Sequence, residues 1–343
     1  MISIIVCSKN ARPAEDFADN IRQTVGTDFE LVHVDNSRRQ HSIFEAYNSG
    51  VERAQGDILC FVHEDVVFHS RDWGRTVAAA LADDRVGAIG VAGGYFIPRH
   101  ADWRFYADGY AHLIQGAFTV EEQPRYYVCH YPDREDGSGL TEVAVIDGVW
   151  MCMRRELFAT IRFDDRRFGG FHLYDTDISM QIVQTGRRLF VTADVLLEHR
   201  SEGNFSAAYA DSVETFMQKW AHLLPCRRGG DSHEQETEEK DLAARRRMDE
   251  RVAHDTAVAR LHELFAAKRE GKACRDYTEE EKRLMDRSVY QSCKLAMKQR
   301  QVGTPEALAR LRDYLAWPLA RQRARLIRKF VWYRILTFGT KRA

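Results

Sequence analysis

Apolar runs and amphipathic segments alternate along the first hundred residues. Four short, mostly apolar runs have the length of buried strands, at 2–7, 29–34, 58–62 and 86–91. Three intervening segments have the spacing of helices, at 14–24, 42–54 and 73–81. Strands that alternate with helices build a mostly parallel sheet with helices packed on its faces. The pattern therefore predicts an α/β fold.

Local signals mark the ends of several elements. Ser42 and Glu45 form an S-x-x-E capping box at the start of the second helix, and Asp72 precedes the third helix as its expected N-cap. Further elements are expected as a strand at 143–146, helices at 155–160 and 176–184, and two strands that end at His199. The mixed pattern thus continues to about residue 200.

The remainder of the chain is helical and highly charged, with a second capping box at Thr278 and Glu281. We therefore divide the chain into an α/β domain at 1–225 and a helical extension at 226–343. The extension's charged helices at 234–300 suit self-association into a homo-oligomer.

Charge divides the chain in the same way. Residues 1–225 carry 22 Lys/Arg and 33 Asp/Glu, a net charge of −11, whereas residues 226–343 carry 28 and 18, a net charge of +10. An acidic domain repels the phosphates of nucleic acid, so no nucleic-acid partner is expected. Segment 321–343 mixes eight basic residues, and no acidic one, with apolar side chains. It suits peripheral contact with an anionic membrane or packing on the domain.

Composition bears on the cellular compartment. The 343 residues include seven cysteines without a C-x-x-C pair, which indicates reduced thiols rather than a disulfide framework or a zinc site. The start of the chain, MISIIVCSKN, lacks the basic region of a signal peptide, and no window reaches the roughly 18 apolar residues of a spanning helix. We expect a cytoplasmic protein, with a peripheral position on the inner face of the membrane as the alternative.

Carboxylates follow several of the predicted strands and one Gly-rich loop, namely Asp35, Glu64 with Asp65, and Asp175 with Asp177. Each alone is typical of a helix cap or a solvated loop. Together they indicate a site, because ligands of open parallel sheets bind beyond the carboxyl ends of the strands. The chain lacks G-x-G-x-x-G, G-x-x-x-x-G-K-[ST] and G-x-S-x-G, which disfavours dinucleotide, P-loop and hydrolase sites.

Two segments carry a resemblance to a known family. AYNSGVERAQGDILCFVHEDV, at 46–66, resembles the stretch of the family 2 glycosyltransferases of the GT-A fold that leads into their metal-binding D-x-D motif. LYDTDISMQIVQTGRRLFVTADVLLEH, at 173–199, resembles their E-D-x-D-L-S segment and distal histidine. The resemblance spans about residues 1–205 and is closest to the StrF-like branch, whose metal strand ends in His-x-Asp.

The resemblance implies a donor site for a nucleotide sugar, with a UDP-sugar favoured. Asp65 would bind Mn²⁺ or Mg²⁺, Glu64 would assist directly or through water, and His199 would be the distal ligand. Asp35 would accept a hydrogen bond from the ring N–H of uracil, and Ser8 would lie beside the same base. A divalent cation held by oxygen ligands suits a diphosphate leaving group, whose negative charge it neutralises.

The resemblance also implies the chemistry. Asp175 matches the second acid of the E-D pair and would be the general base of a single, inverting displacement, whereas Asp177 would cap the helix that starts beside it. The acceptor would be a hydroxyl of a glycan, a lipid-linked molecule or a small molecule. The Arg154-Arg155 pair, after the Asp147-Gly148 turn, would lie on the acceptor side.

The sequence departs from the family pattern at two positions. His63 replaces the first acid of D-x-D, as a ligand or as a residue that only shapes the turn, and Tyr174 replaces the Glu of E-D. These departures keep open an inactive scaffold that binds nucleotide or carbohydrate. A sugar-phosphate nucleotidyltransferase is less favoured, because the loop CSKNARP after the first strand has no glycine.

Overall fold

The computed structural model divides the chain into two compact units, Met1–Ala253 and His254–Ala343. It describes residues 1–106, 109–115, 126–130, 139–201, 203, 205–229, 237–270, 273 and 276–298, and from there 309, 311–312, 315–316, 320 and 323–331. The first unit holds both large sheets, and the helix α6 (Glu238–Arg269) runs from the first unit into the second.

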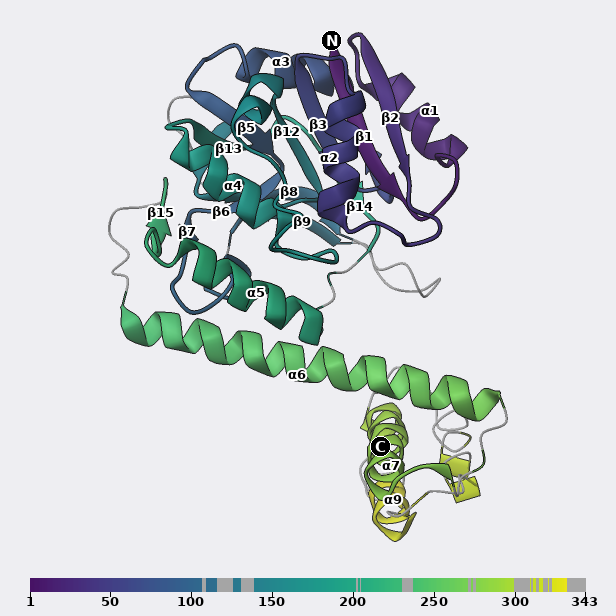
Figure 1. The fold of residues 1–343 in the computed structure, drawn as a ribbon. Helices are drawn as coiled ribbons and strands as arrows, with labels where there is room; N and C mark the ends of the chain where they lie inside the picture. The colour runs from purple at the N-terminus through teal and green to yellow at the C-terminus, as the bar shows by residue number, and fades with distance from the viewer. Residues whose placement is uncertain are drawn as a thin grey trace, which may run out of the picture. The chain divides into compact units, whose positions relative to one another are not determined.

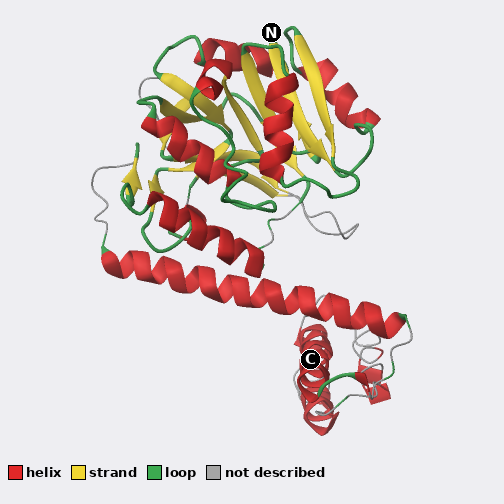
Figure 2. Cartoon of the chain, in the orientation of Figure 1, coloured by secondary structure: helices red, strands yellow, loops and turns green. Residues whose placement is uncertain are grey.

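A seven-stranded sheet forms the centre of the first unit (Figures 1 and 2). Its order is β10 (Leu140–Val143), β13 (Arg188–Thr192), β5 (Val86–Gly90), β12 (Trp150–Arg154), β3 (Ile58–Val62), β1 (Ile2–Ser8) and β2 (Phe29–Asp35). The pairing of neighbours makes five of these strands run in one direction, and β12 and β10 run in the other. The predicted α/β fold with a mostly parallel sheet is confirmed.

Helices cover both faces of this sheet (Figure 1). One face packs against α2 (Ile43–Arg53) and α4 (Tyr174–Gln184), and the other against α1 (Glu15–Thr24) and α3 (Trp73–Ala80). The side chains of β1 alternate between the two cores, because Ile5 faces the first while Ile4 and Val6 face the second. A strand covered on both faces is apolar along most of its length, which explains the run at 2–7, where Ser3 is the polar exception and donates a hydrogen bond to Glu30.

A second sheet lies beside the first and supplies part of the site. Its path is β11 (Val145–Ile146), β6 (Ala92–Gly94), β8 (Tyr110–Gln115), β14 (Leu197–His199) and β4 (Val66–Phe68), with β9 (Tyr126–His130) paired to β8. Antiparallel pairing of β14 with β4 sets His199 opposite Val66. This register brings the end of β14 next to Asp65.

The helix caps agree with the sequence in one case and not in another. Ser42 and Glu45 form the predicted capping box at the start of α2. Asp72 is not a side-chain cap of α3: its backbone is left-handed, with φ 56°, and no cap hydrogen bond reaches its side chain. Its backbone carbonyl instead accepts a hydrogen bond from the N–H of Arg75. The strand expected at 143–146 is divided between β10 and β11, which belong to different sheets.

Short elements complete the first unit: the 3₁₀ helices η1 (Trp103–Phe105) and η2 (Arg155–Ala159), the paired strands β7 (Phe96–Ile97) and β15 (Cys226–Arg227), and α5 (Ala207–Trp220). The first turn of α6 is joined to this unit, because Asp241 accepts hydrogen bonds from the backbone N–H groups of Arg99 and His100 at 2.9 and 3.1 Å. The compact unit therefore extends past residue 225.

The second unit contains α7 (Glu279–Lys298) and α9 (Arg323–Phe330). The predicted capping box at Thr278 and Glu281 is present at the start of α7. Leu326 of α9 is buried against Tyr290 and Leu311, whereas Ile327 is 42% exposed. Most of the basic tail after α9 lies outside the described residues. Among the described helices, none has both the length and the apolar character needed to span a membrane.

Candidate metal centre and its surroundings

The carboxyl ends of β1, β2 and β3 meet at one edge of the central sheet. Ser8 at the end of β1 is in register with Asp35 at the end of β2, and β3 leads directly into His63, Glu64 and Asp65. Parallel strands end at the same edge, so the alternating pattern of the sequence places these groups together.

Three side chains at this edge form a compact group that could hold a metal ion. One ligand atom each of His63, Asp65 and His199 lies within 4.8 Å of the others. His63 Nδ1 is 3.3 Å from His199 Nε2, and His199 Nε2 is 3.7 Å from Asp65 Oδ1. The backbone N–H of Arg200 also donates to the Asp65 carbonyl at 3.2 Å, which joins the two segments. Two imidazoles and a carboxylate are suitable ligands for a divalent first-row metal ion.

The first departure from the family pattern, His63, is therefore part of this group. The hydroxyl of Tyr174 lies 2.7 Å from His63 Nε2 and 3.1 Å from the carbonyl oxygen of Gly148. Burial and the neighbouring His199 lower the pKa of His63, which favours the neutral imidazole that a metal ion requires. The two departures, His63 and Tyr174, are thus in direct contact with each other.

Glu64 lies at the edge but outside the three-residue group. Its carboxylate accepts a hydrogen bond from the Ser8 hydroxyl and one from the backbone N–H of Lys9 at 3.3 Å. Asn10 Nδ2 is 3.5 Å from the same carboxylate. These contacts join the loop after β1 to the end of β3, so Glu64 and Ser8 are linked to each other and not to the imidazoles.

Asp35 is an exposed residue at the end of β2. Its carboxylate accepts a hydrogen bond from the backbone N–H of Ser37 at 2.9 Å. Hydrogen bonds from the Ser37 side chain and backbone lower the pKa of Asp35, so the group is an ionised acceptor. Its side chain is accessible to a ligand that enters from the solvent.

Asp175 lies on the other side of Tyr174, in the first turn of α4, and is 3% exposed. Its Oδ2 accepts hydrogen bonds from Arg104 Nη2 at 2.5 Å and from the Gly148 N–H at 3.0 Å. Gly148 and Tyr174 therefore join Asp175 to the metal group. The Gly148 N–H donates to Asp175, the Gly148 carbonyl accepts from the Tyr174 hydroxyl, and this hydroxyl contacts His63.

Arg104 is shared by three carboxylates. Besides Asp175, it pairs with Asp102 at 3.1 Å and with Asp147 at 2.9 Å. Burial alone would lower the pKa of Arg104, but the charges of Asp175, Asp102 and Asp147 outweigh it and raise that pKa well above its usual value. The side chain of Asp147 is 27% exposed and that of Asp175 only 5%, so solvent and ligands reach Asp147 more easily.

Asp177 does not cap α4, contrary to the sequence expectation. The residue at the N-cap position is Leu173, with a left-handed backbone. The fully buried Asp177 carboxylate instead accepts hydrogen bonds from Trp220 Nε1 at 2.8 Å and from Lys219 Nζ at 3.0 Å. It joins α4 to α5 and has a structural role.

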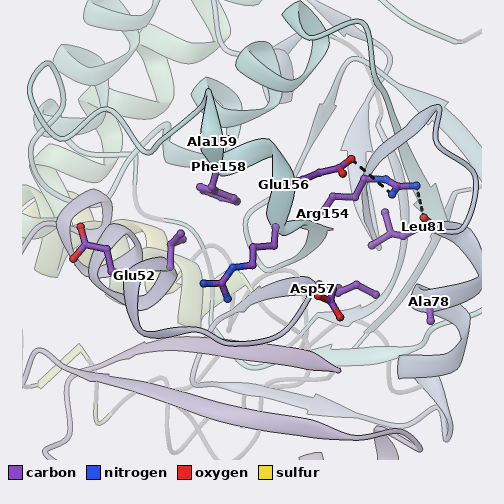
Figure 3. Close-up of a pocket in the computed structure, with 11 residues that line it drawn as sticks. Glu52, Asp57, Ala78, Leu81, Arg154, Glu156, Phe158 and Ala159 are labelled. Carbon is purple, nitrogen blue, oxygen red and sulfur yellow. Dashed lines mark hydrogen bonds and ion pairs between the residues drawn. The ribbon is translucent and has the colours of Figure 1, made fainter.

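The Arg154-Arg155 pair lies at the opposite edge of the central sheet, because Arg154 is in register with Ile58 at the start of β3. The pair lines a pocket of about 760 Å³ (Figure 3). Arg154 donates to the carbonyls of Val86 and Asp83, at 3.0 and 2.9 Å, and Arg155 donates to that of Ala54 at the end of α2. The expectation that this pair lies on the acceptor side is wrong, because backbone carbonyls at the far edge hold both guanidinium groups.

Two residues near the site carry no sequence signal that we used. Arg104 lies within η1, in an irregular aromatic stretch of the sequence. Gln115 ends β8, where its Oε1 lies 3.4 Å from His199 Nδ1. A single Arg or Gln outside a motif is typical of a solvated surface, so only the fold relates these residues to the histidines. The contact of Tyr174 with His63 is likewise visible only in three dimensions.

Solved structures give distant likenesses. GalNAc-T7 with UDP, GalNAc and Mn²⁺ is 11% identical, with a TM-score of 0.42 over 59% of this chain and 43% of that chain, so the present chain covers less than half of it. The mannosyltransferase PcManGT from Pyrobaculum calidifontis, in complex with GDP-Man and Mn²⁺, is 16% identical, with a TM-score of 0.40 over 97% and 87% of the two chains. Residues 1–349 of TarS from S. aureus are 14% identical, with a TM-score of 0.39 over 97% and 89%.

No curated protein sequence matches the chain. A family model described as "Glycosyltransferase like family" matches residues 3–220, which run from the second residue of β1 to the end of α5 and include the whole metal group. Because this match covers more than half of the chain, the chain belongs to the Glycosyltransferase like family, as its resemblance to the family 2 glycosyltransferases implies.

Proposed function

We propose that the chain is a metal-dependent, inverting glycosyltransferase that moves a hexose-type sugar from a nucleotide sugar to an acceptor hydroxyl. The observation that carries this proposal is the group of His63, Asp65 and His199 within 4.8 Å, at the edge where β1, β2 and β3 end. Membership of the Glycosyltransferase like family supports this proposal, and so does a set of ligand atoms at this edge that could hold a divalent cation.

We assign the cation to His63, Asp65 and His199, because their ligand atoms already lie within reach of one ion. Mn²⁺ or Mg²⁺ bound there would supply a Lewis acid that neutralises the charge developing on the leaving diphosphate. The protein's part is to hold the three ligand atoms in place and to keep the imidazoles neutral, which the burial of His63 favours.

The nucleotide would bind on the β1–β2 side of the same edge. Asp35 is exposed and ionised, and can accept the ring N–H of uracil, which supports a UDP-sugar as the favoured donor. Ser8 is in register with Asp35, and Glu64 orders the loop that begins at Ser8. We assign Ser8, Asp35 and Glu64 to this donor region, with Glu64 positioning the loop.

Asp175 is the proposed general base. Its carboxylate removes the proton of the acceptor hydroxyl as the hydroxyl oxygen bonds to the anomeric carbon, and the bond from that carbon to the diphosphate breaks on the opposite side. One displacement inverts the configuration and releases the nucleoside diphosphate. Because Arg104 and the Gly148 N–H now occupy Asp175 Oδ2, the acceptor must displace Arg104 toward Asp147 and Asp102.

The acceptor side and the location follow from the same proposal. Assembly of a surface polysaccharide, glycoconjugate or natural-product glycan would supply a glycan, lipid-linked or small-molecule acceptor.

Exposed Ile327 and the basic residues of α9 support peripheral membrane contact through 321–343, on the cytoplasmic side. The highly charged helices within 234–300 support self-association. The His-x-Asp order of His63 and Asp65 supports the StrF-like branch.

Release of nucleoside diphosphate from a panel of UDP-, GDP-, dTDP- and CMP-sugars tests this proposal. We expect release that depends on Mn²⁺ and is fastest with a UDP-sugar, and we expect Asp65→Asn to abolish it. His69→Gln is the matched control, because His69 lies near Asp65 in the chain but pairs with Glu198 at 3.3 Å. Binding of nucleotide without release from any donor would instead favour the inactive scaffold.

A further inference from the structure

We propose that Tyr174 and Gln115 are positioning residues that set the tautomers of His63 and His199, so that each imidazole turns an unprotonated nitrogen toward Asp65. This inference adds positioning residues to the proposed metal site. The use of the two tautomers in binding a cation rests on the proposed function. The hydrogen bonds that set the two tautomers are present in the metal-free protein.

The Gly148 carbonyl determines the tautomer of His63. The Tyr174 hydroxyl donates its single hydrogen to the Gly148 carbonyl oxygen, which can only accept, at 3.1 Å, and the Tyr47 side chain is its further hydrogen-bond partner. The Tyr174 oxygen then accepts the hydrogen bond at 2.7 Å from His63 Nε2, which must carry the proton. A neutral imidazole has one N–H, so His63 Nδ1 is unprotonated, and this atom faces His199.

The Ser201 carbonyl determines the tautomer of His199 by the same reasoning. Gln115 Nε2 donates to this carbonyl, which fixes the orientation of the amide and leaves Gln115 Oε1 3.4 Å from His199 Nδ1. An amide oxygen can only accept, so Nδ1 carries the proton and His199 Nε2 does not. The Ser201 hydroxyl, 3.2 Å from Nε2, is a donor that suits this tautomer.

Two unprotonated ring nitrogens therefore face each other at 3.3 Å, and neither can donate to the other. The carboxylate of Asp65, 3.7 Å from His199 Nε2, adds negative charge to the same place. A cation between the two nitrogens removes this repulsion. A hydrogen bond between the two histidines cannot remove it, because neither of the facing nitrogens carries a hydrogen. Ligating histidines commonly donate their outer N–H to such fixed acceptors, which orients the ring and raises its basicity.

The Tyr174 hydroxyl is held firmly in place. Its ring packs edge-on against Tyr47 and Phe44, with centroids 5.5 and 6.3 Å away. A Cβ on Gly148 would lie only 2.1 Å from the Tyr174 oxygen, so this close approach requires glycine at 148. Tyr174→Phe keeps these ring contacts and removes only the hydroxyl, which makes it a clean variant.

Long-range ¹H–¹⁵N correlation spectra of metal-free, ¹⁵N-histidine-labelled protein test the inference. His63→Gln and His199→Gln assign the two rings. We expect an Nε2–H tautomer for His63 and an Nδ1–H tautomer for His199. A wild-type His63 with the proton on Nδ1 would overturn the inference without any variant.

The variants then test the two positioning residues separately. Tyr174→Phe should mix the tautomers of His63 alone, and Gln115→Met those of His199 alone. Tyr209→Phe is the matched control, because Tyr209 of α5 is a buried tyrosine of the same core whose ring packs on His172 and Phe205 rather than on His63. Its loss of a hydroxyl should leave His63 unchanged. Spectra in which Tyr174→Phe has no more effect than Tyr209→Phe would contradict the role of Tyr174.

Mn²⁺ affinity, read from the electron paramagnetic resonance signal of the free ion, provides a second measure. Loss of an outer partner should weaken binding by roughly 10- to 100-fold in Tyr174→Phe and in Gln115→Met. Unchanged affinity in both would contradict the inference. A chain that never transfers sugar would still show the two tautomers, so failure of the proposed function and failure of this inference are distinguishable.

Discussion

His63 Nδ1 lies 3.3 Å from His199 Nε2, although 136 residues separate the two histidines in the chain. His63 follows a strand of the central sheet, whereas His199 ends a strand of the second sheet. The antiparallel pairing of β14 with β4 joins them, because β4 begins directly after Asp65. Two sheets thus build one candidate cation site.

The donor set should select among divalent ions. Two imidazole nitrogens and one carboxylate favour first-row transition ions over Mg²⁺, which prefers oxygen ligands. We expect Mn²⁺ and Co²⁺ to raise the thermal midpoint of unfolding at concentrations at which Mg²⁺ does not, because an ion that binds the folded state stabilises it. His63→Asp should bring the Mg²⁺ response toward that of Mn²⁺. Equal responses of the wild type to all three ions would contradict the assignment.

The general base can be identified by comparing two carboxylates that share Arg104. Asp175→Asn should lower the rate of transfer by roughly 100- to 10,000-fold, because the acceptor loses its proton acceptor, while nucleotide affinity stays unchanged. Asp147→Asn is the comparison, since Asp147 binds the same guanidinium at 2.9 Å. Single-turnover kinetics with saturating donor separate the two effects. A larger loss in Asp147→Asn, with near-normal turnover in Asp175→Asn, would move the role to Asp147.

The contact between α4 and α5 depends on a buried charge. Lys219 Nζ is 2.8 Å from Asp177 Oδ1, 3.0 Å from Asp177 Oδ2 and 2.8 Å from Asp164 Oδ2. Lys219→Met leaves the fully buried Asp177 carboxylate without its cation, which should lower the free energy of unfolding at pH 7 by about 3–5 kcal/mol. Adding Asp177→Asn should recover part of this loss. Urea unfolding measures both values.

The same variant should show a characteristic pH dependence. Burial already raises the pKa of Asp177 above its usual 3.8, so its ionisation opposes folding, and this penalty grows as pH rises through the folded pKa. Removal of Lys219 enlarges the penalty. The deficit of Lys219→Met relative to the wild type should therefore be largest near pH 7 and should shrink as pH falls toward 3.8. An equal deficit at pH 7 and pH 4.5 would exclude Asp177 as its cause.

Phe171 offers an exposed aromatic face beside the metal group. Its side chain is 52% exposed, and its ring centroid is 5.6 Å from that of His63. Aromatic rings stack on the apolar faces of sugars, so we expect Phe171→Ala to raise the acceptor KM by roughly 3- to 10-fold with little change in kcat. Phe171→Tyr should behave like the wild type. An unchanged KM in the alanine variant would place the acceptor elsewhere.

The sequence predicts the parts of the fold that local pattern determines. The apolar run at 58–62 coincides with β3, and the capping box at Ser42 is present, because burial on both faces and cap hydrogen bonds are encoded by adjacent residues. Convergence of Ser8, Asp35 and Asp65 at one edge follows from parallel strand ends. These features require no knowledge of distant contacts.

Tertiary contacts explain what the sequence does not predict. Asp177 resembles a helix cap in the sequence, but the indole N–H of Trp220, 43 residues away, binds its carboxylate. Arg104 reaches Asp175 across 71 residues, and Tyr174 reaches His63 across 111. Such pairs can be predicted only when the sheet order is known. In the sequence, His63 and Tyr174 are therefore two separate departures from the family pattern, whereas in the structure they contact each other.

Titration of Mn²⁺ into the protein with saturating UDP, followed by the resonance signal of the free ion, tests the central claim most directly. We expect one bound Mn²⁺ per chain, with an affinity that is higher when UDP is present. Asp65→Asn or His199→Gln should abolish this binding, and His69→Gln should retain it. A free-ion signal that is unaffected by the protein, or binding that survives the loss of both Asp65 and His199, would contradict it.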